Sequence, residues 1–134
     1  MAKILLVEDD DLVRDMLTQV LERASHHVIC AANGEEATVC LQKDEPDIMV
    51  TDIIMPKKSG ITLISEVRNR HPRMEIIAIS GGGRLDPTGY LDLSESLGAS
   101  VSFEKPIDNT ALLMAIDLLL HGKKEKTSDE EAHH

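Results

Sequence analysis

The sequence predicts an α/β fold in which a five-stranded parallel sheet is covered by helices on both faces. Two observations lead to this prediction. Short, continuous runs of aliphatic residues recur along the chain, and segments with helical hydrophobic spacing alternate with them. Continuous apolar runs are typical of strands that are buried on both faces of a sheet. Their regular alternation with helices indicates that the sheet is parallel.

Four of the predicted strands are short apolar runs, and the fifth, residues 101–103, has a serine between two apolar residues. Ile4 to Val7 form the first run, and Pro46 precedes the third. Short apolar runs of this kind favour strands over helices. The five predicted strands cover residues 4–7, 28–31, 48–50, 76–79 and 101–103.

The predicted helices are supported by start and stop signals as well as by spacing. Asn33, with Glu36 three residues later, resembles a capping box. Asp86 followed by Pro87 resembles an N-cap with proline at the first helical position, and Gly98 stands where a glycine commonly ends a helix. The five predicted helices cover about residues 11–24, 34–43, 60–71, 87–98 and 108–121.

The length of 134 residues favours one domain, which we expect to cover residues 2–121. Residues 122–134 are almost entirely polar, and we expect them to form a solvated, disordered tail. The final residues, His133 and His134, are consistent with the remnant of an expression tag. The sequence contains no internal repeat and no linker between domains.

The charge of the chain disfavours several classes of function. Fourteen Lys and Arg stand against 24 Asp and Glu, and the formal net charge of −10 disfavours binding to nucleic acid or to anionic membranes. One Tyr, one Phe and no Trp also leave few rings on which single-stranded nucleic acid could stack. The longest apolar run is too short to span a bilayer and no signal segment is recognisable, so we expect a cytoplasmic protein.

Candidate functional residues follow four of the five predicted strands. Glu8 and Asp9 follow the first strand, Asp52 the third, Ser80 the fourth and Lys105 the fifth. Because ligands of open parallel sheets bind at the carboxyl ends of the strands, we expect these side chains to converge. Carboxylates that lie close together repel one another unless a cation neutralises them, and oxygen ligands without His or Cys suit Mg²⁺.

The same residues could support phosphoryl transfer. A carboxylate such as Asp52 can act as a nucleophile and form an aspartyl phosphate. Lys105 could then pair with the phosphoryl oxygens, and the Ser80 hydroxyl could hydrogen-bond to them. Each residue alone also has an ordinary explanation, such as an acidic run that complements the dipole of the helix that follows it. Their joint placement at the strand ends is what favours a functional site.

Four segments of the chain resemble the receiver domain of response regulators in two-component signalling. They are KILLVEDD, DIMVTDIIMPKKSG, IIAIS and FEKP, and they occur in the family's order across about residues 2–121. The resemblance implies a stand-alone, chemotaxis-regulator-like receiver with a flavodoxin-like fold and strand order 2-1-3-4-5. It also implies a phosphoacceptor signalling module rather than an enzyme that turns over a substrate.

The resemblance implies a Mg²⁺ site next to a phosphoacceptor. Asp52 falls at the family's phosphoacceptor position. Glu8 and Asp9 match its acidic pair, Asp9 as a direct metal ligand and Glu8 acting largely through water. The backbone carbonyl of Ile54 would complete the metal shell.

The resemblance further implies the reaction and the partners. A sensor histidine kinase or a phosphotransfer protein would present a phosphohistidine, and Asp52 would attack its phosphorus. Lys105 matches the lysine of the family's Lys-Pro pair, and Ser80 matches its hydroxyl position. Catalysis would come mainly from positioning and charge neutralisation. The phosphorylated surface would then signal to a downstream protein target.

Two other classes of function stay open. A Mg²⁺-dependent phosphohydrolase could use Asp52 as its nucleophile, although that class usually has a second carboxylate two residues later, where Ile54 stands. A flavin-binding electron carrier has a similar topology, but this chain has almost no aromatic residues to stack on a flavin ring.

Two features concern the output of the domain. Ser102 stands where the family commonly has an aromatic residue, and its neighbour Phe103 should point to the opposite face because strand side chains alternate. The last predicted helix is apolar on two faces, and we expect one of them to form a homodimer or target surface. The first face contains Leu112, Leu113, Ile116, Leu119 and Leu120, and the second contains Ala111, Met114, Ala115 and Leu118.

Overall fold

The computed structural model describes residues 2–53, 55, 58–80 and 94–132, and it describes side chains up to residue 122. The predicted alternation of strands and helices is confirmed, and residues 94–97 are helical where the fourth predicted helix should end. The described elements are β1 (Lys3–Val7), α1 (Asp11–Arg23), β2 (His27–Ala31), α2 (Gly34–Lys43), β3 (Ile48–Asp52), α3 (Gly60–Arg70), β4 (Glu75–Ser80), β5 (Val101–Glu104) and α5 (Asn109–Ala132).

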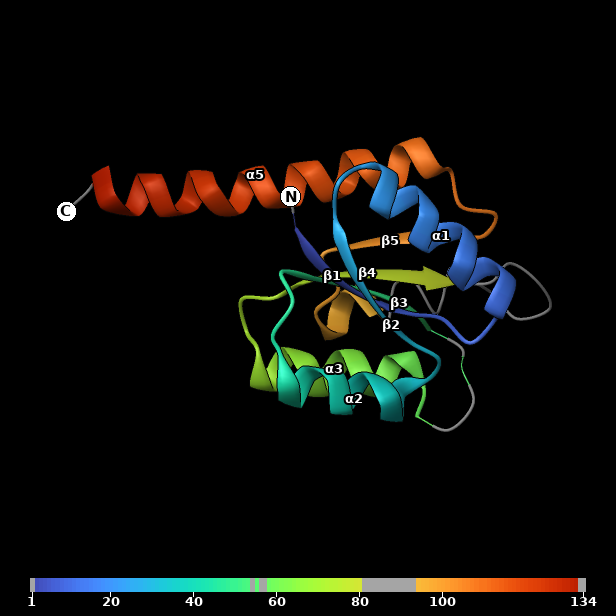
Figure 1. Ribbon diagram of the computed structural model, residues 1–134. Coiled ribbons are helices and arrows are strands. Elements are labelled where there is room, and N and C mark those ends of the chain that lie inside the picture. Colours follow the sequence, from blue (N-terminus) through green and yellow to red (C-terminus); the bar gives the residue numbers. More distant parts are fainter. Residues whose placement is uncertain (1, 54, 56–57, 81–93, 133–134) are drawn as a thin grey trace.

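The five strands form one parallel sheet in the order β2-β1-β3-β4-β5, as predicted. Helices α1 and α5 cover one face of the sheet, and α2 and α3 cover the other (Figure 1). The strand order reverses at the neighbouring pair β1 and β3, because the chain moves from β1 to one side and then returns to the other. Ligands of doubly wound sheets bind outside the carboxyl ends of the strands at such a reversal.

Both faces of the central strands β1, β3 and β4 are packed, which explains the continuous apolar run in each of them. Along β1, Ile4 and Leu6 belong to the core under α1 and α5, whereas Leu5 and Val7 belong to the core under α2 and α3. This alternation follows from the two-residue period of a strand. All four side chains are almost completely buried. A strand with a solvent-exposed face would alternate apolar with polar residues instead.

Short polar side chains begin α1, α2 and α3, and the cap predicted at Asn33 is confirmed. The Asp10 carboxylate accepts hydrogen bonds from the backbone N–H groups of Leu12 and Val13 at the start of α1. Asn33 and Ser59 cap α2 and α3 in the same way. These bonds satisfy backbone donors that have no partner within the helix. Gly98, with φ of 127°, follows the helical residues 94–97, as expected for a glycine that ends a helix.

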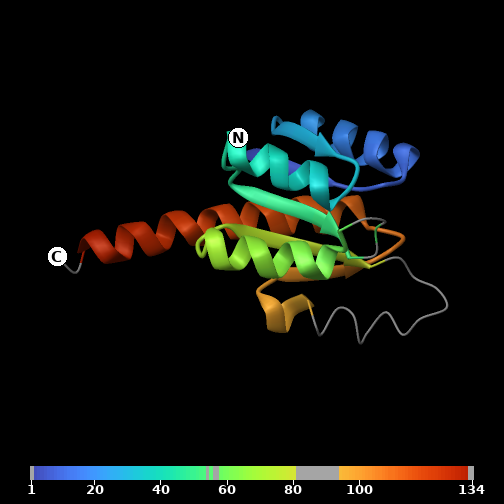
Figure 2. The same ribbon diagram turned by 90° about the horizontal axis from the view of Figure 1, so that it is seen from below.

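The last helix differs from the prediction. We expected it to end near residue 121 and a disordered tail to follow, but α5 continues through Gly122 to Ala132 and extends beyond the sheet (Figures 1 and 2). A glycine inside a helix costs only about 1 kcal/mol relative to alanine. The residues after Gly122 are rich in Lys and Glu, which are good helix formers and offset that cost. No helix in the described part of the chain is long and apolar enough to cross a membrane.

Candidate functional site

The register of the sheet brings the predicted site residues to one edge. Val7 pairs with Thr51, so that Glu8, the next residue, lies beside Asp52 at the end of β3. Ser80 ends the adjacent strand β4 and pairs with Glu104, the residue before Lys105. The carboxyl ends of four strands therefore deliver two carboxylates, a hydroxyl and an ammonium group to one place.

The acidic cluster is tight and one part of it is buried. Glu8, Asp9 and Asp52 each offer a carboxylate oxygen, and these oxygens lie within 4.8 Å of one another. Glu8 and Asp52 are only 1% and 4% exposed, whereas Asp9 is open to solvent. Burying two carboxylates this close together is costly unless a positive charge lies beside them.

Lys105 provides a positive charge at this position. Its Nζ donates a hydrogen bond of 2.9 Å to Asp52 Oδ2 and lies 2.9 Å from Glu8 Oε1. The lysine therefore bridges both buried carboxylates. Because Asp9 reaches the same place from the solvent side, the three acids carry more negative charge than one lysine neutralises.

The titration of Glu8 and Lys105 reflects this environment. Burial raises the pKa of the Glu8 carboxyl; the Lys105 ammonium and the Asp10 N–H oppose this, and the charge of Asp52 adds to it. For Lys105, burial alone would lower the pKa, but the hydrogen bonds to Glu8 and Asp52 outweigh it and raise the pKa above its usual value. Lys105 therefore stays protonated at neutral pH.

The Glu8 side chain is held by the start of α1. Its Oε2 accepts a 3.1 Å hydrogen bond from the Asp10 N–H, and its backbone carbonyl accepts a 2.8 Å bond from Arg14 Nη1. Arg14 also pairs with the Asp11 carboxylate. Sequence reasoning did not identify Arg14, because its contact depends on how the chain turns between β1 and α1.

The Asp52 backbone is fixed by a close approach of α3. A side chain at Gly60 would place its Cβ 2.6 Å from the Cα of Ile53 and still closer to the carbonyl oxygen of Asp52. The Gly60 N–H also donates a 2.8 Å hydrogen bond to the Ile53 carbonyl. Gly60 was not among the predicted site residues, since glycine after Ser59 reads as an ordinary helix start.

Ser80 lies at the same edge and is fully buried. Its Oγ makes no hydrogen bond within the residues that the structure describes. A buried hydroxyl without a partner is uncommon, and such groups concentrate where a ligand or a changing group completes the bonding. The proposed metal ligand Ile54 lies outside the described residues.

Ser102 and Phe103 on β5 are arranged as the two-residue period of a strand predicts. The Ser102 hydroxyl donates to the Glu95 carboxylate in the helical residues 94–97. Phe103 points the other way and packs against the core under α1 and α5. The two side chains therefore face opposite sides of β5.

The two predicted faces of α5 differ in burial. Leu112 and Ile116 of the first face are fully buried against the sheet. On the second face, Met114 and Leu118 are 60% and 70% exposed. Ala115, which we assigned to the second face, is instead buried, because it lies near the boundary between the two. The exposed part of the second face is thus narrower than predicted.

The fold and the edge cluster together define a flavodoxin-like α/β domain with a cluster of acidic side chains where the strand order reverses. The chain belongs to the family described as "Response regulator receiver domain", which matches residues 4–117. It is therefore a receiver domain of two-component signalling. Receiver domains generally bind Mg²⁺ in an acidic pocket and interact with histidine kinases or phosphotransfer proteins.

Individual relatives agree with this assignment. Transcriptional regulatory protein CpxR of Klebsiella pneumoniae is 34% identical over 120 residues, which cover 90% of this chain and 50% of CpxR. The chain thus spans about half the length of that relative. Sporulation initiation phosphotransferase F of Bacillus subtilis is 30% identical over 106 residues, covering 79% of this chain and 83% of that protein.

A solved structure shows the same fold. The response regulator receiver domain protein from Clostridium thermocellum superposes with a TM-score of 0.85 at 27% sequence identity. The match covers 92% of this chain and 98% of the Clostridium chain. The predicted fold class and strand order are therefore confirmed.

Proposed function

We propose that this receiver domain accepts a phosphoryl group from the phosphohistidine of a sensor histidine kinase or a phosphotransfer protein, and that Asp52 is the acceptor. The observation that carries this proposal is the contact between Asp52 and Lys105, at 2.9 Å, inside a cluster of three acids. A nucleophilic carboxylate next to a protonated lysine suits the transfer of a strongly anionic phosphoryl group. The Bacillus relative is itself named a phosphotransferase, which supports the same chemistry.

The acidic cluster fits Mg²⁺. All of its donor atoms are carboxylate oxygens, no histidine or thiol belongs to it, and the oxygens lie close enough together to share one ion. Asp9, Asp52 and Glu8 would hold the metal, with Glu8 acting largely through water, and the carbonyl of Ile54 would complete its shell. When bound, Mg²⁺ supplies positive charge that stabilises the phosphoryl oxygens during transfer.

The transfer itself is a substitution at phosphorus. One carboxylate oxygen of Asp52 attacks, a P–O bond forms, and the P–N bond to the donor histidine breaks with its electron pair returning to the imidazole. Lys105 already lies at Asp52 Oδ2, so its ammonium group can follow the new charge onto the phosphoryl oxygens. Ser80, whose hydroxyl has no partner within the described residues, can donate a hydrogen bond to the same oxygens.

Phosphorylation would change the surface of the domain through these two side chains. Lys105 follows β5 directly, and Ser80 ends β4, so new bonds at Asp52 act on the ends of both strands. Ser102 on β5 donates a hydrogen bond to Glu95. Position 102 is the one at which the family commonly has an aromatic residue. The exposed Met114 and Leu118 of α5 are the surface that we propose for a homodimer or a downstream protein target.

The test uses a small phosphodonor, Mg²⁺ and intact-mass measurement. We expect a single base-labile phosphoryl adduct on the wild type, none on Asp52→Asn, and the normal adduct on Asp15→Asn, which changes an exposed aspartate of α1. If Asp52→Asn still acquires the adduct, the acceptor assignment is wrong. Rapid, continuous hydrolysis of unrelated phosphate esters would instead favour the phosphohydrolase class.

A further inference from the structure

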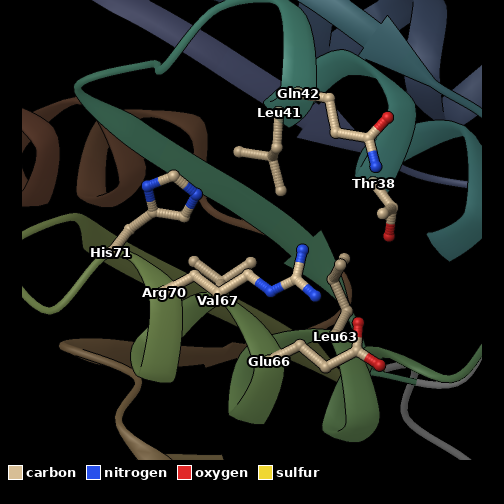
Figure 3. A pocket seen from close by; sticks show the side chains of 8 residues that line it. All are labelled: Thr38, Leu41, Gln42, Leu63, Glu66, Val67, Arg70 and His71. Carbon is tan, nitrogen blue, oxygen red and sulfur yellow. The ribbon is translucent and has the colours of Figure 1, made fainter.

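A cavity on the far side of the sheet from α1 and α5 is not used by the proposed phosphoryl chemistry. It lies between α2 and α3 and has a volume of about 250 Å³ (Figure 3). Its apolar part is formed by Leu41 of α2 and by Leu63 and Val67 of α3. Polar and charged side chains surround this apolar part, namely Thr38, Gln42, Glu66, Arg70 and His71.

Most of the charged groups around the cavity already have partners. At one end, Lys58 Nζ donates to Glu66 Oε2 at 2.7 Å and to Thr38 Oγ1 at 2.9 Å, so the Glu66 charge is neutralised. At the other end, His71 Nδ1 lies 3.1 Å from a carboxylate oxygen of Glu45. Neither end therefore offers a free charge to a ligand.

Arg70 is the exception within the described residues. Its guanidinium group makes no hydrogen bond or ion pair there, and Figure 3 shows the side chain extending from α3 along the cavity. Just after α3, it is Arg68 and not Arg70 that bonds the backbone carbonyls of His71 and Pro72. Arg70 therefore places a positive charge without a partner among the described residues beside an apolar cavity, in a chain whose net charge is −10.

We propose that this cavity binds a small organic acid with an apolar body and one carboxylate. The apolar body would lie against Leu41, Leu63 and Val67, and the carboxylate would pair with Arg70, whose planar group suits two parallel hydrogen bonds. The volume equals that of about eight water molecules, which matches one short aliphatic acid and is below the range of larger ligands. This proposal does not depend on phosphorylation of Asp52.

Titration of the full chain with hexanoate, followed by ¹H–¹⁵N NMR, tests the proposal. We expect saturable shifts at amides of residues 38–42 and 63–71, with hexanamide binding roughly tenfold more weakly and hexylamine causing no saturable shift there. Hexanamide has the same apolar body without the charge, so it separates charge recognition from simple burial. Equal binding of the acid and the amide, or shifts confined to other residues, would overturn the proposal.

Two charge variants give opposite expected results. Arg70→Gln should weaken hexanoate binding roughly fivefold or more, whereas Glu66→Gln should strengthen it, because Lys58 then loses its partner and adds a free positive charge. Arg73→Gln, which changes an exposed arginine that does not line the cavity, should bind as the wild type does. Unchanged hexanoate affinity in Arg70→Gln would show that the arginine does not recognise the carboxylate.

Discussion

Replacing Gly60 with alanine is the sharpest test of how the backbone at Asp52 is held. The new Cβ would lie 2.6 Å from the Cα of Ile53 and 2.9 Å from the carbonyl carbon of Asp52. Carbon atoms in contact normally lie about 3.5–4.0 Å apart, so α3 or the end of β3 must move by about 1 Å. Overpacking of this kind typically costs about 1–3 kcal/mol, and more where the obstacle is backbone.

Gly122→Ala provides a matched control for this prediction. It makes the same chemical change inside α5, where a Cβ meets no atom within 4 Å. Alanine is favoured over glycine in a helix by about 1 kcal/mol, so this variant should keep or slightly increase the free energy of unfolding.

Urea denaturation followed by circular dichroism measures both variants. We expect Gly60→Ala to lower the unfolding midpoint by about 1 M, the ratio of a loss of about 2 kcal/mol to a urea slope of about 2 kcal/mol per molar. Phosphorylation by a small phosphodonor should slow as well, because the clash is with the backbone of the proposed acceptor. A Gly60→Ala protein with the wild-type midpoint would refute the argument, and so would a loss of stability in Gly122→Ala as large as that in Gly60→Ala.

Three further predictions use the same denaturation assay. Lys105→Met leaves two buried carboxylates without their cation. Because Lys105 itself is partly exposed, we expect a loss near the low end for a buried ion pair, about 3 kcal/mol without Mg²⁺, and unchanged stability would contradict the charge argument. Mg²⁺ at ten times its dissociation constant should raise the free energy of unfolding of the wild type by about 1.4 kcal/mol, and EDTA should reverse this gain. Asp9→Asn should abolish the gain, whereas the control variant Asp15→Asn should retain it. Burial lowers the pKa of His26 below its ordinary value of 6.5, partly offset by an aspartate of α5, so the unfolded chain takes up the proton first as pH falls. Stability should therefore fall as pH drops from about 7.5 towards 5.5, by at most about 1.4 kcal/mol per pH unit. His26→Gln should remove this dependence and His27→Gln should retain it.

The elements of the fold were predictable because they depend on local patterns. A strand buried on both faces must be apolar throughout, as Ile4 to Val7 are, and a helix start needs a side chain such as that of Asn33 to satisfy its free donors. The end of α5 was not predictable in this way. Gly122 costs a helix little, and whether the chain stops there depends on the helix propensity of the residues that follow.

The candidate site was predictable to the extent that strand ends determine it. Glu8, Asp52 and Lys105 each lie within two residues of the end of a predicted strand, and parallel strands bring their carboxyl ends together. Arg14 and Gly60 act on the same site through contacts that arise only when α1 and α3 pack beside it. No pattern in the sequence distinguishes them from an ordinary helical arginine and an ordinary glycine at a helix start.

The charge balance of the site links its stability to its proposed function. Lys105 satisfies two buried carboxylates at 2.9 Å each, while the third acid, Asp9, stays in solvent. The site therefore keeps an excess of negative charge that a divalent cation would lower, at the same place where a phosphoryl group would raise it. Because Lys105 is the shared partner, any change of charge at Asp52 changes its bonds to Glu8 as well. If Asp52 is the acceptor, as we propose, its phosphorylation would act through Lys105 on the ends of β1, β3 and β5, and this route would not need an aromatic residue at position 102.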